Sequence, residues 1–190
     1  MSPAALSVDR FSFLLKEALQ LFYEDLAKTR PPDLRTSWYK REQEIVSLFS
    51  FRYLVPLLQR EGVDPGVLRI EGRVRQHPTT GDGRERGRKD LVVWPDCLDT
   101  VWRPDVKHPP AVLEWKLSTS EITPKQILDG AETDLCWLKA NADLMGAGYG
   151  ILVEWPQRKL RIICRQVTNQ RGSCIEEVLI SFPRAIAATA

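Results

Sequence analysis

Three residues in the middle of the chain are of the types that metal-assisted hydrolysis uses. Asp90 starts an apolar run that continues to residue 94, and Glu114 and Lys116 interrupt a second apolar run over 111–117. Both runs are short, rich in β-branched residues and bounded by prolines, so they predict buried β-strands. A carboxylate or an ammonium group on such a strand is costly to bury unless it is paired or bound to a metal.

The alternation of side chains along a strand places Glu114 and Lys116 on one face, and Leu113, Trp115 and Leu117 on the other, in a core. An antiparallel hairpin with Trp94 roughly opposite Val112 would bring Asp90 near Glu114 and Lys116. Two carboxylates and one lysine then converge at the open end of the hairpin. Oxygen ligands of this kind suit Mg²⁺ or Mn²⁺ rather than zinc.

An Asp at the start of one strand and a Glu-x-Lys on the next resemble the PD-(D/E)xK nuclease superfamily, which has the restriction-endonuclease-like fold. The match consists of Asp90, Glu114 and Lys116, and Lys89 stands where the name of the motif has Pro. That position is variable in the superfamily. The resemblance covers about residues 37–155 as an order of elements, but only a handful of residues as a motif. It implies metal-dependent hydrolysis of phosphodiester bonds, with a DNA endonuclease as the expected activity.

The resemblance also implies a role for each residue of the motif. Asp90 and Glu114 would hold one or two Mg²⁺ (or Mn²⁺) ions, joined by the backbone carbonyl of Trp115. Lys116 would orient the attacking water or stabilise charge on the phosphoryl group. A lysine that acts as a base needs a lowered pKa, which burial favours and nearby carboxylates oppose. Orientation and charge stabilisation are therefore the expected roles of Lys116.

The first core helix of such nucleases often adds a Glu to the metal site. The predicted helix 37–59, which Pro56 is expected to kink or end, carries Glu42 inside its apolar stripe, with apolar residues three, four and seven positions later. Some archaeal Holliday-junction resolvases have this spacing. Glu44, near the edge of the stripe, is the alternative fourth ligand, and a salt bridge from Glu42 to a basic side chain is the purely structural interpretation.

A basic segment precedes Asp90, with seven Lys/Arg residues against three acidic ones between Arg69 and Lys89. It predicts either a solvated loop or an edge that contacts phosphates. Gln126, near the start of a helix predicted from Thr123 to about residue 141, either caps that helix or contacts the substrate. The candidate nucleic-acid-binding residues are Arg73, Arg75, Arg84, Arg86, Arg88 and Gln126.

A second Asp competes with Asp90 for the metal-binding role. Asp105 follows a proline in the connecting segment 95–110. Asp90 is preferred, because about four residues of strand at roughly 3.3 Å each would separate that end of the hairpin from Glu114.

The hydrophobic periodicity predicts one α/β domain over residues 1–190. It consists of an N-terminal helical extension (1–36, with a helix over 9–28), a core (37–155) and C-terminal strands (156–190). The expected fold is a central mixed β-sheet flanked by helices. Its order is the α-β-β-β-α-β core of the restriction-endonuclease-like fold, with an extra N-terminal helix.

The composition narrows the classes of partner. The formal net charge is only +2, so DNA would have to be held by a local patch rather than by the whole surface. The four cysteines have no CxxC spacing, and only two histidines are present, which disfavours a zinc site. With no signal peptide and no membrane-length apolar run, we expect a soluble cytoplasmic protein. Its partner would be nucleic acid, with a homodimer or a larger complex left open.

A catalytically inactive member of the same fold is the main alternative. Such a protein would act as a nucleic-acid-binding or protein-interaction subunit. The intact set of Asp90, Glu114 and Lys116 favours the active enzyme. The low net charge favours a partner that supplies affinity for DNA.

Overall fold

The computed structural model describes residues 6–28, 42–80, 86–95, 108–117, 124–154 and 159–183. The helices are α1 (Val8–Lys28), α3 (Glu42–Phe49), a π-helical segment (Ser50–Leu54), α4 (Val55–Arg60) and α5 (Pro124–Ala140), with short 3-10 turns at Pro65–Val67, Pro78–Thr80 and Ala142–Leu144. The strands are β1 (Leu68–Arg75), β2 (Arg86–Val93), β3 (Ala111–Leu117), β4 (Ala147–Glu154), β5 (Arg161–Gln170) and β6 (Ser173–Phe182).

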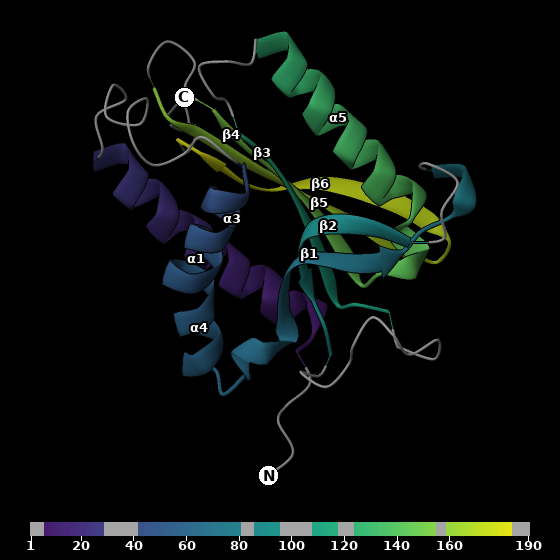
Figure 1. Cartoon of the computed structure of the whole chain (residues 1–190), viewed down its shortest axis with the longest axis horizontal. Coiled ribbons are helices and arrows are strands. Elements are labelled where there is room, and N and C mark those ends of the chain that lie inside the picture. The colour runs from purple at the N-terminus through teal and green to yellow at the C-terminus, as the bar shows by residue number, and fades with distance from the viewer. Residues whose placement is uncertain are drawn as a thin grey trace, which may run out of the picture.

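The strands form one mixed sheet in which their spatial order follows the sequence from β1 to β6 (Figure 1). Neighbouring strands are antiparallel except for β3 and β4, which are parallel because α5 carries the chain back between them. The expected α/β class and the expected order of helix, three strands, helix and strand are confirmed. No helix in the described ranges is long and apolar enough to cross a membrane.

Helices cover both faces of the sheet, with α1, α3 and α4 on one side and α5 on the other (Figure 1). The core on the first side is aromatic where α1 and α3 meet β3. Trp115 lies 4.9 Å from the ring centroid of Phe49 and 6.0 Å from that of Phe22. A smaller core under α5 joins Val112 of β3 to Leu138 of the helix. Strand β3 is therefore buried on both sides, although Glu114 and Lys116 interrupt its apolar run.

The predicted register between β2 and β3 is wrong by two residues. Val112 pairs with Val92 rather than with Trp94, and the next pair is Leu91 with Leu113. A shift of two keeps every side chain on its expected face, because the side-chain period of a strand is two. The consequence is that Asp90 comes to the level of Glu114 itself.

The helix predicted over 37–59 is divided in the structure, and its residues 37–41 lie outside the described ranges. Pro56 has no N–H for the carbonyl of Arg52, which disfavours regular helical bonding there. The chain forms the π-helical segment just before this proline. There the N–H of Val55 donates to the carbonyl of Ser50, five residues earlier rather than the four of an α-helix. Glu42 is the first residue of α3 that the structure describes, and it lies next to the sheet, within 3.2 Å of Lys116 on β3.

Candidate metal and phosphate site

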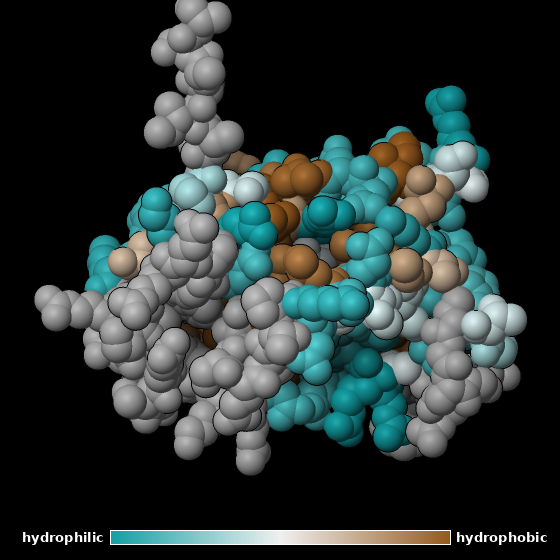
Figure 2. Space-filling view, turned by 90° about the horizontal axis from the view of Figure 1, so that it is seen from above, coloured by the Kyte–Doolittle hydropathy of each residue, from teal (hydrophilic) through white to brown (hydrophobic). Residues whose placement is uncertain are grey.

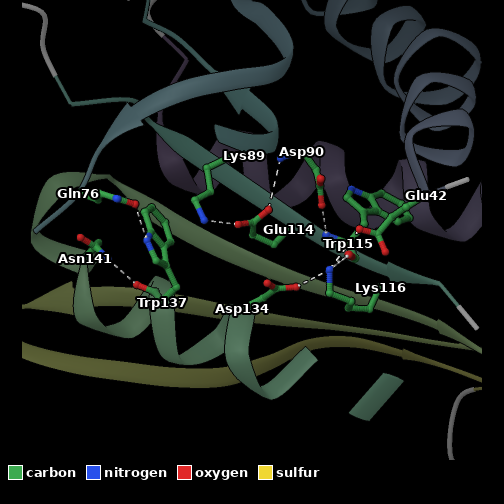
Figure 3. A network of polar contacts seen from close by, with 10 residues as sticks. All are labelled: Glu42, Gln76, Lys89, Asp90, Glu114, Trp115, Lys116, Asp134, Trp137 and Asn141. Atoms are coloured by element: carbon green, nitrogen blue, oxygen red, sulfur yellow. Dashed lines mark hydrogen bonds and ion pairs between the residues drawn. The ribbon is translucent and has the colours of Figure 1, made fainter. Parts of the chain in front are cut away.

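The sheet opens between β2 and β3 at the level of Asp90. Backbone pairing of the two strands ends at Leu91 and Leu113. Carboxylates replace the next backbone acceptors: the N–H of Trp115 donates to Oδ2 of Asp90 at 2.7 Å, and the N–H of Asp90 donates to Oε2 of Glu114 at 3.3 Å (Figure 3). Asp90 and Glu114 therefore lie together where the two strands separate.

The ladder between β1 and β2 is interrupted at the same level. It pairs Ile70 with Leu91 and Gly72 with Lys89 but skips Glu71 and Asp90. Glu71 has a φ of 51°, in the left-handed region that residues other than glycine rarely adopt. This conformation bends β1 away from Asp90 for one residue, so backbone pairing fails on both sides of that carboxylate.

Lys116 connects three elements around this opening. Its Nζ lies 3.2 Å from Oε1 of Glu42 on α3 and 3.0 Å from Oδ2 of Asp134 on α5. The same Nζ donates to the backbone carbonyl of Trp115 at 3.1 Å. The side chain passes under Gly130 of α5, where an added Cβ would lie 3.2 Å from Cδ and Cε of the lysine. The ammonium group is therefore held between the helices on both sides of the sheet (Figure 3).

Lys89 holds Glu114 from the other side. Its Nζ lies 2.5 Å from Oε1 of Glu114, and the exposed fractions of the two side chains are 10% and 8%. The same Nζ lies 3.5 Å from the ring centroid of Trp137, in a cation–π contact. The indole N–H of Trp137 donates to Oε1 of Gln76 at 3.0 Å, which fixes the ring (Figure 3). Glu114 is thus clamped between an ammonium group and a backbone N–H.

Burial dominates the electrostatics of the acids. It raises the pKa of Glu114 to about 7, opposed by Lys89 and reinforced by Asp90. Burial is also the largest cause of the raised pKa values of Asp90 and Glu42. Proton binding to each of these three carboxylates is therefore easier than in water.

Lys116 shows the opposite balance. Burial disfavours its charged form, but Asp134 and Glu42 outweigh burial and raise its pKa above the usual range. The group therefore stays an ammonium ion at neutral pH, which disfavours a role as general base and leaves orientation and charge stabilisation.

The donor set is of the type that magnesium prefers, but the acids here are paired with lysines. Four carboxylates (Glu42, Asp90, Glu114 and Asp134) share two ammonium groups in a largely buried cluster, and this excess of negative charge favours a divalent cation. Within the described residues, however, no three His, Cys, Asp or Glu side chains are close enough together to hold a metal as they stand. Metal binding would require Glu114 or Glu42 to move away from its lysine.

No family model, curated protein or solved structure matches this chain. What the cluster can do chemically is therefore inferred from its geometry alone. That geometry unites an acid from β2, an acid and a lysine from β3, and one acid from a helix on each side.

The four predicted catalytic residues, Asp90, Glu114, Lys116 and Glu42, come together in this cluster, and the carbonyl of Trp115 faces the same lysine. Glu44 is exposed on α3, outside the cluster contacts described above. Asp105 lies outside the described residues, as do Thr123 and Arg84.

Four of the candidates for contact with nucleic acid are exposed on the described surface. Arg73, Arg75 and Arg88 are exposed on β1 and β2, and Gln126 is exposed in the first turn of α5. Arg88 lies 3.1 Å from Glu71 in an ion pair. Arg86 belongs to β2, but its side chain is not among those described.

Two members of the cluster, Asp134 and Lys89, are absent from the sequence-based prediction. Asp134 follows Ile127 by seven residues and precedes Leu138 by four, so it stands in the apolar stripe of its helix. The reasoning that selected Glu42 would have found it. Lys89 had a weaker signal, a charge directly before Asp90 at the entrance to an apolar strand.

Proposed function

We propose that this protein is a Mg²⁺-dependent nuclease that hydrolyses phosphodiester bonds of DNA, with Asp90, Glu114, Lys116 and Glu42 in its active site. The observation that carries the proposal is the acid–lysine cluster at the point where β2 and β3 separate. Its residues come from the same order of elements as in the PD-(D/E)xK nucleases that the sequence resembles, and a restriction-endonuclease-like fold is part of the proposal.

Each residue has a distinct task in this scheme. Asp90 and Glu114, with the carbonyl of Trp115, would hold the metal, and Glu42 would complete the set directly or through water. The bound metal would lower the pKa of a water molecule and neutralise charge on the scissile phosphate. Lys116, kept cationic by Asp134 and Glu42, would orient that water and stabilise the charge that develops on the phosphoryl oxygens.

The DNA backbone would lie along the β1–β2 edge. Arg73 and Arg75 point to solvent there, and Arg88 is also exposed. Each cation that contacts a phosphate releases counterions, so this edge supplies affinity without sequence specificity.

The test is cleavage of supercoiled plasmid by the purified protein with Mg²⁺ or Mn²⁺, compared with an EDTA control and the variants Asp90→Ala and Asp90→Asn. The proposal expects nicking or linearisation by the wild type only. Cleavage by the Asp90 variants at the wild-type rate would refute the role of this carboxylate.

One observation favours the alternative, a catalytically inactive protein of the same fold that binds nucleic acid or another protein. The Lys89–Glu114 pair places an ammonium group where an active site would have its metal ligand free. Calorimetric titration with Mn²⁺ separates the two proposals. Binding that Asp90→Asn abolishes supports the enzyme, whereas no binding to the wild type supports the inactive subunit.

A further inference from the structure

A pocket of about 370 Å³ lies directly beside the acid–lysine cluster, between α5 and the strands β3 to β5. Glu114, Lys116 and Asp134 line one end of it. The walls between that end and the far rim are largely apolar. They are formed by Leu128 and Leu135 of α5 and by Ile151, Leu152 and Ile163 of the sheet.

The sheet register explains why the pocket starts at the cluster. Glu114 pairs with Gly150, and Gly150 pairs with Arg165, so these residues form one row across the face of the sheet under α5. The row covers two strand spacings, about 9.6 Å between the backbones of β3 and β5. Its middle position carries no side chain, and a Cβ at Gly150 would lie 2.8 Å from Cδ2 of Leu135. The glycine lets the helix pack closely without a side chain between the two ends of the row.

The far rim of the pocket is cationic. Arg161 and Arg165 line it, and their side chains remain 43% and 45% exposed although each forms an ion pair, with Glu154 and Glu176 respectively. Lys116 supplies a cation at the near end.

Glu114 and Asp134 lie at the same end as Lys116, and Glu132 also lines the pocket, so the near end has an excess of negative charge until a metal binds. With the divalent cation of the proposed function held there, the near end would accept a phosphate, the apolar slot a nucleoside, and Arg161 and Arg165 the next phosphate of a single strand.

We infer that this pocket receives one unpaired nucleotide next to the scissile phosphate, so the preferred substrate is single-stranded DNA or a duplex with a single-stranded tail. This inference rests on the proposed nuclease function and specifies its substrate class. The volume lies at the lower end of small-molecule sites and suits one nucleoside. A base that is stacked and paired in a duplex could enter only after leaving the helix, which costs unstacking energy.

Among the residues that the structure describes, the exposed apolar side chains outside this pocket do not form a comparable site. On the described part of the face in Figure 2, hydrophobic residues appear in separate patches between hydrophilic ones. The large exposed apolar residues Phe13, Phe51 and Val178 come from α1, the π-helical segment and β6, which are different parts of the chain. The pocket beside α5 is distinguished from them because it is continuous with the cluster.

The test measures binding separately from cleavage. The Asp90→Asn protein is titrated in Mg²⁺ into three fluorescent probes: an oligothymidylate, a blunt duplex, and the same duplex with a single-stranded tail. The pocket variant is Ala131→Leu, which adds volume from a lining position on α5. The matched control is Thr133→Leu, an exposed position on the same helix that does not line the pocket.

We expect the single strand and the tailed duplex to bind more tightly than the blunt duplex. Ala131→Leu should weaken binding of those two probes about tenfold, which corresponds to the loss of about one base contact. The affinity for the blunt duplex should stay the same. Thr133→Leu should have no effect. Arg165→Gln, a second variant that leaves the helix untouched, should weaken the tailed duplex more than the blunt one.

Equal binding of the three probes would overturn the inference, as would equal loss on all of them in Ala131→Leu or no binding of DNA. Failure of the proposed function gives a different result. In that case the wild type cleaves neither plasmid nor the oligothymidylate nor the tailed duplex with Mg²⁺ or Mn²⁺, or Asp90→Asn cleaves as the wild type does, whatever the order of affinities for the probes.

Discussion

Glu114 shows how a buried acid can be stabilised on a strand that is apolar on both sides. A carboxylate in such a place is costly unless its oxygens are satisfied, and both oxygens have donors here, the ammonium group of Lys89 and the N–H of Asp90. Trp137 lies against the lysine and shields the pair from solvent. Because each partner would be costly to leave alone, the pair should respond very differently to single and double substitution.

Lys89→Met keeps an apolar stem beside Trp137 but leaves Glu114 without its cation. At about pH 8 we expect a loss of about 3 kcal/mol in the free energy of unfolding, because the charge of Glu114 would then be buried and unpaired. At about pH 5 the loss should be smaller, because Glu114 can take up a proton there. Urea denaturation at the two pH values measures both losses.

Two further variants serve as controls for this substitution. The double variant Lys89→Met/Glu114→Gln should recover most of the loss, since it removes both charges. Arg88→Met, at the exposed neighbouring position, should cost less than about 1 kcal/mol. A loss in Lys89→Met that is the same at both pH values would contradict this interpretation of the pair.

The raised pKa of Glu114 also predicts how the wild type responds to pH without metal. The folded state binds this proton more tightly than the unfolded state, because the pKa rises from 4.5 to about 7 on folding. Stability is therefore highest at low pH in this window and falls as the pH rises from 4.5 through about 7. The raised pKa values of Asp90 and Glu42 act in the same direction.

Urea denaturation in EDTA at a series of pH values measures this slope. Glu114→Gln should flatten it, because the variant removes the group with the raised pKa. A wild-type stability that rises through this window would show that the cluster does not control it.

At the residue scale, the sequence was informative where a charge interrupts an apolar pattern. Asp90, Glu114, Lys116 and Glu42 were selected in this way, and all four meet in the structure. The contact of Lys89 could not be derived, because it depends on how far β2 separates from β3 and on a tryptophan of α5. The local sequence pattern of β2 encodes neither the separation of the two strands nor the position of that tryptophan.

At the scale of elements, α5 has to leave space for a lysine that comes from the sheet. Gly130 does this at a helical position where glycine costs about 1 kcal/mol relative to alanine. A Cβ there would lie 3.2 Å from two carbon atoms of Lys116, so the lysine would have to shift by a few tenths of an ångström. Helix stability and the position of the lysine therefore place opposite demands on this residue.

Gly130→Ala should consequently separate stability from activity. We expect the free energy of unfolding to stay the same or to rise by up to about 1 kcal/mol, while plasmid cleavage falls about tenfold because Lys116 is displaced. Thr133→Ala, at an exposed position of the same helix, should stabilise slightly without changing cleavage. Unchanged cleavage in Gly130→Ala would mean that the position of Lys116 tolerates this shift.

The elements were predictable where their signals are local. Pro124 starts α5 as expected, and the apolar spacing of α1 gave a helix that begins within one residue of the prediction. The register of β2 and β3 was missed, because a connection that extends from residue 94 to residue 110 does not fix the pairing as a tight turn would. Pro56 predicted a kink or an end of the second helix, but the π-helical form of the break at residues 50–54 was not predicted.

At the scale of the whole molecule, the net charge is only +2, but acidic and basic side chains are concentrated in different places. The acids of the cluster lie in the sheet and against its helices, whereas Arg73, Arg75 and Arg88 are exposed at the β1–β2 edge. Several arginines elsewhere on the described surface form ion pairs, as Arg60 does with Glu17 at 2.7 Å, and Arg88 itself is paired with Glu71. If DNA binds, most of the electrostatic contact should therefore come from this one edge.

Arg73→Gln tests that expectation through the dependence of binding on salt. If Arg73 contacts a phosphate, its removal should weaken binding of every DNA probe by a similar factor and reduce the slope of log affinity against log salt by about 1. Arg171→Gln is the charge-matched control, because this exposed arginine lies at the turn between β5 and β6. Titrations of the Asp90→Asn protein at several salt concentrations measure both slopes. Equal slopes for the two variants would mean that DNA responds to the net charge of the molecule, and the β1–β2 edge would then have no special part in binding.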